Sequence, residues 1–359
     1  MNFDVRRQKA QKLLSNLGLD ALILCQGENL RYFCNFTGTD GVFILTADQT
    51  VFLTDSRYTT QAGQQVIADD IQEYKVKADA VAKYLGGQSL SKFGFEASIA
   101  FAMFEDLRNS GQPSWHWHAL RDELEKIRLI KDDQETDLIR RAARLNKKAL
   151  EDVLPIIQPG AIERDIALAL EFSLKKNGAE EKAFDFIVAS GPRGALPHGI
   201  ASNRALLHSE LVTIDFGCCF HGYHSDETVT LAVGLIEDEL RKIFDIVLEA
   251  HDRAIQTVSP GIPLIDIDRV ARDYIESAGY GVYFGHGLGH GVGLDVHEAP
   301  TVSPRSKTVA EPGMVFTIEP GIYLPNIGGV RIEDMVIVTE EGCQVLTLIP
   351  KTFRNILVN

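Results

Sequence analysis

The sequence has no uninterrupted apolar run of about 18 residues, the length that a membrane-spanning helix needs, and its first residues carry charges throughout. They predict an amphipathic first helix and no secretory signal, so we expect a cytoplasmic protein. An excess of basic residues is absent as well: 36 Lys and Arg stand against 50 Asp and Glu, and the formal net charge is -14. This balance argues against nucleic acid and anionic membranes as partners.

Cysteine is sparse in this sequence. The five cysteines, an odd number, include no CxxC pair, which argues against a disulfide framework and against a thiolate zinc site. Low-complexity segments are also missing, and the composition is that of an ordinary globular protein. Because 359 residues exceed the usual size of one hydrophobic core, we expect two domains.

Helix and strand signals alternate from the first helix to about residue 120. Residues 21–25 predict a buried strand, and residues 41–55 predict two strands joined by a turn at residues 47–49. This alternation predicts an α/β domain. A long, charged, helix-periodic stretch follows over residues 121–157, and we expect the domain boundary near its start, at about Lys126.

The rest of the chain contains an internal repeat. Residues 148–180 resemble residues 253–281: each has a helix, a Pro-Gly pair and a second helix that ends at glycine. A strand-rich segment follows each half. The repeat predicts a duplicated unit, and a duplicated unit that closes on itself would bring the two strand-rich segments face to face.

The first strand-rich segment predicts a β-hairpin with a turn at His221-Gly222. If those two residues form the loop, Gly217 pairs with Asp226. Asp215 and Asp226 then share a face as diagonal neighbours, roughly 7 to 8 Å apart. Two unpaired carboxylates on a buried face repel each other and lose hydration, and a bound cation removes both costs. The alternative is a bulge that turns one aspartate to solvent.

The second strand-rich segment predicts another hairpin, with turn residues around Asn326. Folding about Asn326 places Glu319 opposite Glu333 on one face, while Asp334 points the other way. Arg331 shares the face of Glu333, where it can pair with a carboxylate or hold a negative group of a substrate. Either hairpin alone could lie at the surface, but two at equivalent places in a repeat indicate a shared site.

A glycine-rich stretch over residues 285–300 contains three histidines. His286 and His290 have the spacing of a helical zinc pair, but alternating glycines disfavour a helix. In an extended segment their rings lie about 13 Å apart, so one can bind a metal while the other contacts substrate or packs. A phosphate loop is disfavoured, because neither GxGxxG nor GK[ST] is present. Four carboxylates with one imidazole suit a pair of manganese, cobalt, iron or zinc ions. His297 lies an odd number of residues from His290, beyond a bend in the chain.

Segments known from one family occur in the family's order along nearly the whole chain. They are NLRYFCNFTGTDG, DSRY, SGPRGALPHG, TIDFG, SDETVT, GHGLGHGVG, VHEAP, TIEPGIY and GGVRIED. With them the chain resembles the metal-dependent Xaa-Pro peptidases, aminopeptidase P and prolidase, of the creatinase/aminopeptidase "pita-bread" fold. The resemblance implies an α+β protein: a smaller α/β creatinase/prolidase-like N-terminal domain over residues 1–125, then a pita-bread catalytic domain, built from an internal duplication, over residues 126–359.

The resemblance also implies roles for individual residues. It implies two divalent metal ions, manganese or cobalt before zinc or iron, held by Asp215, Asp226, His290, Glu319 and Glu333. It implies proton transfer by Glu319, stabilisation of the reaction intermediate by His198 and His297, and substrate contacts from His286 and Arg331. One segment departs from the family pattern: many members have an apolar residue and an arginine at the positions of Glu227 and Val229. Both positions face away from Asp226, so ligation should survive, while a neighbouring structural contact should change.

The function that the resemblance implies is that of a cytosolic, homodimeric Xaa-Pro aminopeptidase, a hydrolase that removes the residue preceding proline from small peptides. An Xaa-Pro bond is a tertiary amide without an N–H group, which general peptidases fit poorly. The first alternative is a prolidase, which is restricted to dipeptides. The second is a non-enzymatic pita-bread protein that binds peptides, but such proteins lose ligands that this chain keeps.

Overall fold

The computed structural model describes residues 1–357. The chain divides into two compact units, Met1–Arg128 and a second unit that begins at Leu129, so the expectation of two domains is confirmed. Among the helices of the described part, none combines the length and the apolar character that crossing a bilayer requires.

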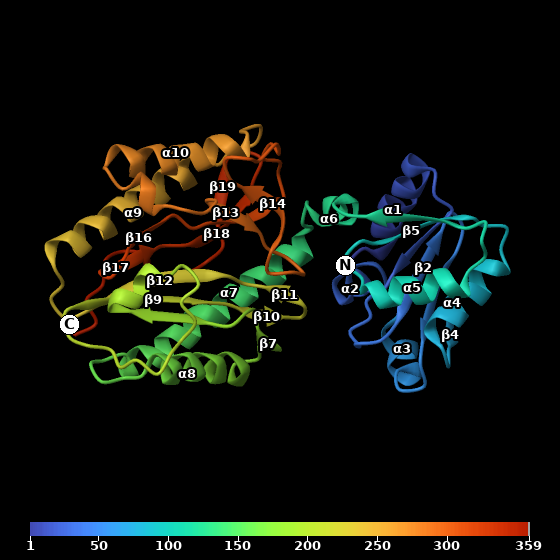
Figure 1. The fold of residues 1–359 in the computed structure, drawn as a ribbon, viewed down its shortest axis with the longest axis horizontal. Coiled ribbons are helices and arrows are strands. Elements are labelled where there is room, and N and C mark those ends of the chain that lie inside the picture. The colour runs from blue at the N-terminus through green and yellow to red at the C-terminus, as the bar shows by residue number, and fades with distance from the viewer. Residues whose placement is uncertain (358–359) are drawn as a thin grey trace. The chain divides into compact units, whose positions relative to one another are not determined.

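The N-terminal unit contains a mixed sheet, and helices form most of the connections between its strands (Figure 1). The strands are β1 Ala21–Leu24, β2 Val42–Thr46, β3 Thr50–Thr54, β4 Asp70–Glu73, β5 Lys92–Glu96 and β6 His116–Leu120. The helices are α1 Phe3–Leu17, α2 Gly27–Cys34, α3 Thr59–Gln65, α4 Lys77–Gly86, α5 Phe101–Ser110 and α6 Glu123–Arg128. The strand order is β4-β3-β2-β1-β5-β6. This is the α/β domain predicted from the sequence, with the predicted turn between β2 and β3.

The C-terminal unit carries several small sheets. Its strands are β7 Glu181–Lys182, β8 Ile187–Ser190, β9 Glu210–Phe216, β10 Cys218–Phe220, β11 Tyr223–His224, β12 Glu227–Val233, β13 Gly289–Gly291, β14 Glu298–Val302, β15 Val315–Ile318, β16 Gly321–Leu324, β17 Gly328–Arg331, β18 Asp334–Val338 and β19 Cys343–Val345. One sheet has the order β12-β9-β8 and another the order β14-β13-β15-β18-β19, and two short ones have the orders β11-β10-β7 and β16-β17. The first two sheets each come from one strand-rich segment of the repeat.

Two helix pairs cover these sheets from opposite sides (Figure 1). They are α7 Asp133–Val153 with α8 Glu163–Lys176, and α9 Asp238–Thr257 with α10 Leu264–Ser277; short 3-10 helices lie at Leu154–Ile156, Gly191–Ala195 and Gly281–Tyr283. Both members of the repeat therefore have the predicted helix, Pro-Gly and helix order. Gly160 and Gly261 have φ angles of 90° and 83°, a conformation that favours glycine and turns the chain between the helices.

Each helix pair has its own hydrophobic core. Leu170 of α8 lies in one buried cluster with Ile214 of β9, and Val247 of α9 lies in another with Phe316 of β15. These clusters fix the two sheets on their own helices, so the polar face of each hairpin is left to meet the other half.

The helix-periodic stretch over residues 121–157 is not one continuous helix, because the chain is extended between α6 and α7. Lys131 N donates to Gly313 O at 2.9 Å there, which draws the chain along the edge of the second unit. Asp132 then begins α7: its Oδ1 accepts from Glu135 N at 2.8 Å, and Glu135 Oε2 accepts from Asp132 N at 2.9 Å. This capping box is a local helix-start signal that the periodicity of the longer stretch concealed.

Candidate metal centre

The first acidic hairpin has the register predicted from its turn. β9 and β12 are antiparallel, and Thr228 pairs with Asp215. His221 and Gly222 form the loop with φ angles of 48° and 79°, the positive values that a two-residue hairpin turn requires. Asp226 therefore lies diagonally across from Asp215, and their oxygens approach within 4.8 Å.

The second acidic hairpin is also in its predicted register. β15 pairs with β18 and β16 with β17, and Asn326 at the tip has a φ angle of 64°. Glu319 consequently lies opposite Glu333. Asp334 points to the other side of the sheet, where it lies 3.3 Å from Lys351.

His290 reaches the two hairpins because glycines flank it. A Cβ atom on Gly289 would lie 1.9 Å from Thr317 O, and one on Gly291 would lie 2.2 Å from Ala299 O. Side chains at these positions would push β13 away from its neighbours. The alternating glycines thus allow a close approach of strands and bring the His290 ring against the carboxylates.

The side chains of both hairpins and His290 converge on one point. His290 Nε2 lies 3.3 Å from Glu319 Oε1 and 3.6 Å from Asp226 Oδ2. Two overlapping groups have all their ligand atoms within 4.8 Å of one another: His290, Glu319 and Glu333, and Asp215, Asp226 and Glu333. Because four carboxylates and one imidazole form a mostly hard set, this arrangement fits a pair of divalent cations.

The electrostatics of the carboxylates support the same fit. Burial, reinforced by the neighbouring carboxylates, raises the pKa of Asp226 and of Glu333 well above its usual range. Burial raises the pKa of Glu319, but the hydrogen bond and charge of His290 outweigh it and lower that pKa to about 2. Asp215 Oδ1 is buried and accepts no hydrogen bond from the described residues. A cation would replace the protons that such a crowded set otherwise needs.

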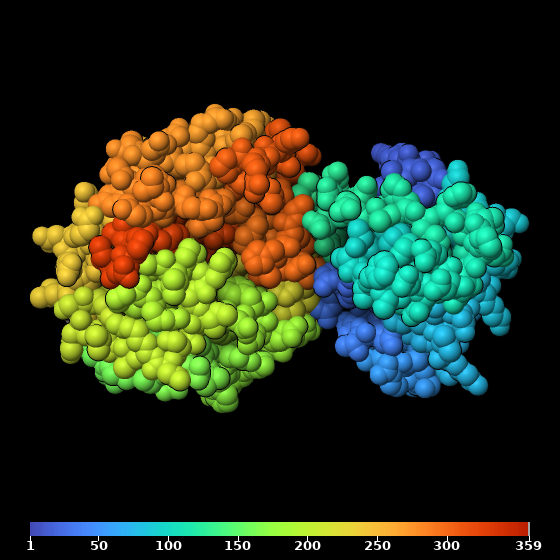
Figure 2. Space-filling model, viewed as in Figure 1, coloured from blue at the N-terminus to red at the C-terminus, as the bar shows by residue number. Residues whose placement is uncertain are grey.

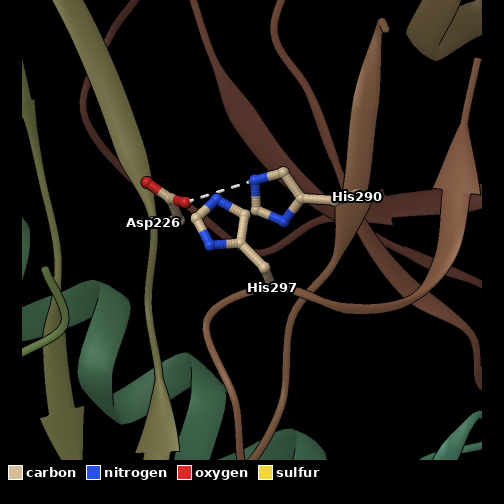
Figure 3. A group of neighbouring side chains, drawn as sticks. All are labelled: Asp226, His290 and His297. Atoms are coloured by element: carbon tan, nitrogen blue, oxygen red, sulfur yellow. Dashed lines mark ion pairs between the residues drawn. The ribbon is translucent and has the colours of Figure 1, made fainter. Parts of the chain in front are cut away.

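His297 stands directly beside this cluster. Figure 3 shows its ring next to that of His290, with Asp226 pointing toward both; the two ring centroids are 4.2 Å apart. His297 forms a third possible ligand group with Asp226 and His290, although its side chain is exposed. Its position therefore suits either a cation or a substrate bound in front of the cluster.

One cavity collects the residues that the sequence singled out. Its volume is about 710 Å³, within the range of small-molecule sites. Its lining includes His198, Asp215, Asp226, His286, His290, His297, Glu319, Arg331 and Glu333. The structure thus brings all nine candidate residues to one place, the carboxylates at its buried side and His198 at an exposed part of its wall.

Tyr323 is a cavity residue that the sequence reasoning missed. Its hydroxyl group accepts from Arg331 Nη1 at 3.0 Å and lies 2.9 Å from His286 Nε2. Arg331 Nη2 in turn pairs with Asp215 Oδ2 at 2.6 Å. This contact confirms the expectation that Arg331 can pair with a carboxylate. The sequence contained a signal for Tyr323. Side chains on one face of a strand recur every second residue, and Tyr323 follows Glu319 by an even number of residues, so both are expected on the same face.

The segment that contains Glu227 and Val229 contacts the site through Thr228. Thr228 Oγ1 donates to Glu333 Oε2 at 2.6 Å. Glu227 and Val229 face the opposite side, as expected: Val229 is packed in a hydrophobic cluster, and Glu227 pairs with Lys351 at 2.6 Å. The strand therefore turns Thr228 toward the cavity, and Glu227 and Val229 toward the side behind it.

The fold and the site together define a two-domain, metal-dependent hydrolase of the pita-bread type. The chain belongs to metallopeptidase family M24, whose profile matches residues 137–340, and residues 6–130 match the Creatinase/Prolidase N-terminal domain.

Similar proteins extend over nearly the full chain. The Xaa-Pro dipeptidase of Pyrococcus horikoshii is 36% identical over 99% of this chain and 100% of its own. The structure of an Xaa-Pro dipeptidase from Bacillus anthracis has a TM-score of 0.95 and 41% identity, covering 98% of this chain and 99% of that one. The X-Pro aminopeptidase structure from Thermotoga maritima has a TM-score of 0.87 and 35% identity, covering 95% and 99%.

Proposed function

We propose that this protein is an Xaa-Pro dipeptidase that uses two divalent metal ions to hydrolyse the bond between a first residue and proline. The observation that carries the proposal is the convergence of both acidic hairpins and His290 on one buried point of a cavity of about 710 Å³. Buried, mutually repelling carboxylates cost folding energy, which makes them a strong indication of a cation site.

The choice of a dipeptidase rests on the comparisons. The resemblance of the sequence alone favours the Xaa-Pro aminopeptidase, with the prolidase as the alternative. Relatives named Xaa-Pro dipeptidase, at 36% and 41% identity over almost the whole chain, support the second reading better than the first. The X-Pro aminopeptidase from Thermotoga maritima, at 35% identity, keeps the aminopeptidase as the competing candidate.

The proposed ligands are the five residues that the resemblance implied. They are Asp215, Asp226, His290, Glu319 and Glu333. Two cations held there would activate a water molecule and polarise the scissile carbonyl group. Manganese or cobalt is proposed before zinc or iron, because the set is dominated by carboxylates.

The remaining steps belong to side chains of the cavity. We assign proton transfer to Glu319, which accepts a proton from the attacking water and later donates one to the departing proline nitrogen. His198 and His297 donate hydrogen bonds to the oxygen that becomes negative during attack. His286 and Arg331, linked through Tyr323, position the substrate.

Several further properties complete the proposal. The N-terminal domain comprises residues 1–125 and the catalytic domain residues 126–359. This division is supported by the two compact units, the first of which ends at Arg128 and the second of which begins at Leu129. The substrates are small peptides with proline in the second position. The protein is a cytoplasmic homodimer; light scattering tests the dimer, and a mass equal to one chain would contradict it.

A substrate series tests the proposed function. Ala-Pro, Ala-Pro-Ala and Ala-Ala are each assayed with manganese, cobalt and zinc. We expect kcat/KM for Ala-Pro to exceed that for Ala-Pro-Ala by about tenfold or more, and Ala-Ala to be a poor substrate. Preference for the tripeptide would instead favour the aminopeptidase, and absence of hydrolysis with every ion would favour a binding protein.

A further inference from the structure

The two halves of the C-terminal unit meet along a seam between β12 and the junction of β17 with β18. On the cavity side, Glu333 N donates to Thr228 O at 3.2 Å, and Thr230 Oγ1 donates to Arg331 O at 2.8 Å. β12 and β18 belong to different sheets, so only a few such bonds join them there. The distance between Asp226 and Glu333 therefore depends on what holds the seam from its other side.

The C-terminal segment closes that other side. Leu346 N donates to Met335 O of β18 at 2.8 Å, and Ala232 N of β12 donates to Arg354 O at 2.9 Å. The chain between these contacts runs from one sheet to the other. Figure 2 shows the C-terminal residues, in red, between the green and the orange parts of the C-terminal unit.

Lys351 lies in the middle of this segment, directly behind the carboxylate cluster. Its Nζ is 2.6 Å from Glu227 Oε1 and 3.3 Å from Asp334 Oδ1, and the side chains of Lys351, Glu227 and Asp334 are 7%, 0% and 9% exposed. Glu227 directly follows Asp226, and Asp334 directly follows Glu333. Because neighbouring strand residues point to opposite faces, the ammonium group joins the backs of two candidate ligand positions across the seam.

The partners of this ammonium group are not equally anchored. Asp334 also lies 3.1 Å from His251 Nε2 and accepts from Thr347. Glu227 accepts from Ile349 N at 3.1 Å, but its other oxygen is buried without a hydrogen-bond partner in the described part of the chain. Glu227 thus depends on Lys351 for its countercharge, and through Lys351 it is tied to the better anchored Asp334.

We propose that Lys351 is a positioning residue for the metal centre. By pairing with Glu227 and Asp334, Lys351 holds β12 against β18. Asp226 and Glu333 then stay at the separation at which both can bind the same two metal ions. The inference rests on the proposed function, since it takes those two residues as ligands. It also explains the departure at Glu227: a charged residue in the family's apolar position is accommodated by a lysine from the C-terminal segment.

Metal binding without substrate tests the positioning role. Lys351→Met removes the bridging charge and keeps a side chain of similar length. We expect at least one ion to bind more weakly, by about 10- to 100-fold, the usual effect of losing a residue that supports ligands, measured by titration calorimetry and elemental analysis. The matched control is Lys148→Met, which removes an exposed lysine paired with Asp152 and should leave binding unchanged.

A double variant separates positioning from mere stability, and it remains informative if Lys351→Met does not fold. Glu227→Leu combined with Lys351→Met removes both members of the pair between these two residues, while Asp334 keeps His251 and Thr347 as partners. Apolar replacements of a buried pair are often as stable as the original. We expect thermal stability close to that of the unsubstituted protein, while metal affinity stays reduced. Metal affinity equal to that of the unsubstituted protein in the double variant would overturn the positioning role.

The same titrations keep this inference distinguishable from the proposed function. If the unsubstituted protein binds two ions and Lys351→Met binds both equally well, only the positioning role fails. If the unsubstituted protein binds no divalent ion, the proposed metal-dependent function fails with it.

Discussion

At the scale of single residues, Glu319 has contacts that suit both metal binding and proton transfer. Its Oε1 lies 3.3 Å from His290 Nε2 and accepts from Thr317 Oγ1 at 3.1 Å. These contacts orient one oxygen toward the cluster and hold the carboxylate at the wall of the cavity. A residue held in this way can be tested by a substitution that keeps its shape and removes its basicity.

We expect Glu319→Gln to separate metal binding from turnover. The amide keeps an oxygen of similar reach, so metal affinity should weaken only partly. An amide cannot accept the proton of the attacking water. General-base catalysis typically contributes a factor of about 10² to 10⁴ to the rate, so kcat should fall by a factor of about 10² or more. Steady-state kinetics with Ala-Pro at saturating manganese measure the effect. Unchanged turnover at full metal occupancy would remove Glu319 from this role.

The control for that experiment is Glu340→Gln, an exposed residue beyond β18, which should leave kcat unchanged. Asp334 is the nearer acidic neighbour, and the sequence correctly predicted that it points away from the cavity. It is nevertheless unsuitable as a neutral control, because it pairs with His251 and Lys351 behind the site. Pointing away from a site on one strand face does not make a residue unimportant to it.

Arg305 gives a residue-scale test of the proposed preference for dipeptides. It is an exposed guanidinium group on the wall of the cavity, whereas Arg331 is already paired with Asp215. We expect Arg305 to pair with the free carboxylate of a dipeptide, which lies one residue from the bond that is cut. We expect Arg305→Ala to raise KM for Ala-Pro by up to about fivefold, because an exposed ion pair contributes at most about 1 kcal/mol.

The comparison substrate for that variant is Ala-Pro-Ala, whose carboxylate lies one residue further away. Its KM should change less than that of Ala-Pro. Equal changes for both peptides, or none for either, would show that Arg305 does not recognise the terminal carboxylate.

At the scale of elements, the glycines around His290 decide how closely strands pack. Because a Cβ atom on Gly289 would meet Thr317 O at 1.9 Å, Gly289→Ala must push β13 away from β15 and carry His290 with it. Overpacking of this kind costs about 1 to 3 kcal/mol. We expect a lower free energy of unfolding by that amount, measured by urea titration, and weaker metal binding.

Gly285→Ala is the matched control within the same glycine-rich segment. Nothing lies within 4 Å of a Cβ atom built on Gly285, so this substitution should change stability and metal binding little. If the two variants behaved alike, close strand packing would not be the reason for the glycine at position 289.

The elements also differ in how far the sequence predicted them. The hairpin turns at His221-Gly222 and Asn326 were correctly identified, because positive φ angles favour these few residue types. The break between α6 and α7 was missed, because the extended residues between them pair with residues far along the chain, just before β15, as Lys131 does with Gly313. Helix periodicity continued across the break and concealed it.

At the scale of the whole molecule, we expect the proposed metal binding to be linked to folding of the C-terminal unit. A ligand present at 100 times its dissociation constant stabilises the folded state by about 2.7 kcal/mol, which corresponds to roughly 5 to 10 °C for a domain of this size. We expect chelation to lower the melting temperature of this unit by at least that amount and to abolish activity, and manganese or cobalt to restore both.

Calorimetry with and without a chelator measures this linkage, with elemental analysis to establish the metal content. Magnesium, which demands octahedral geometry and keeps several of its waters, is the comparison ion and should restore less. Metal-free protein with the same melting temperature and full activity would contradict the proposed metal centre.

The sequence by itself determined the content and register of each acidic hairpin. Turn residues and the two-residue period of strands act over a few positions, so they place Asp215 with Asp226 and Glu319 with Glu333. Only the tertiary structure decided how the two hairpins meet. Arg331 pairs with Asp215 across 116 residues of sequence, and Lys351 with Glu227 across 124. Contacts at such separations follow from how the two halves pack together, and no local rule specifies that packing.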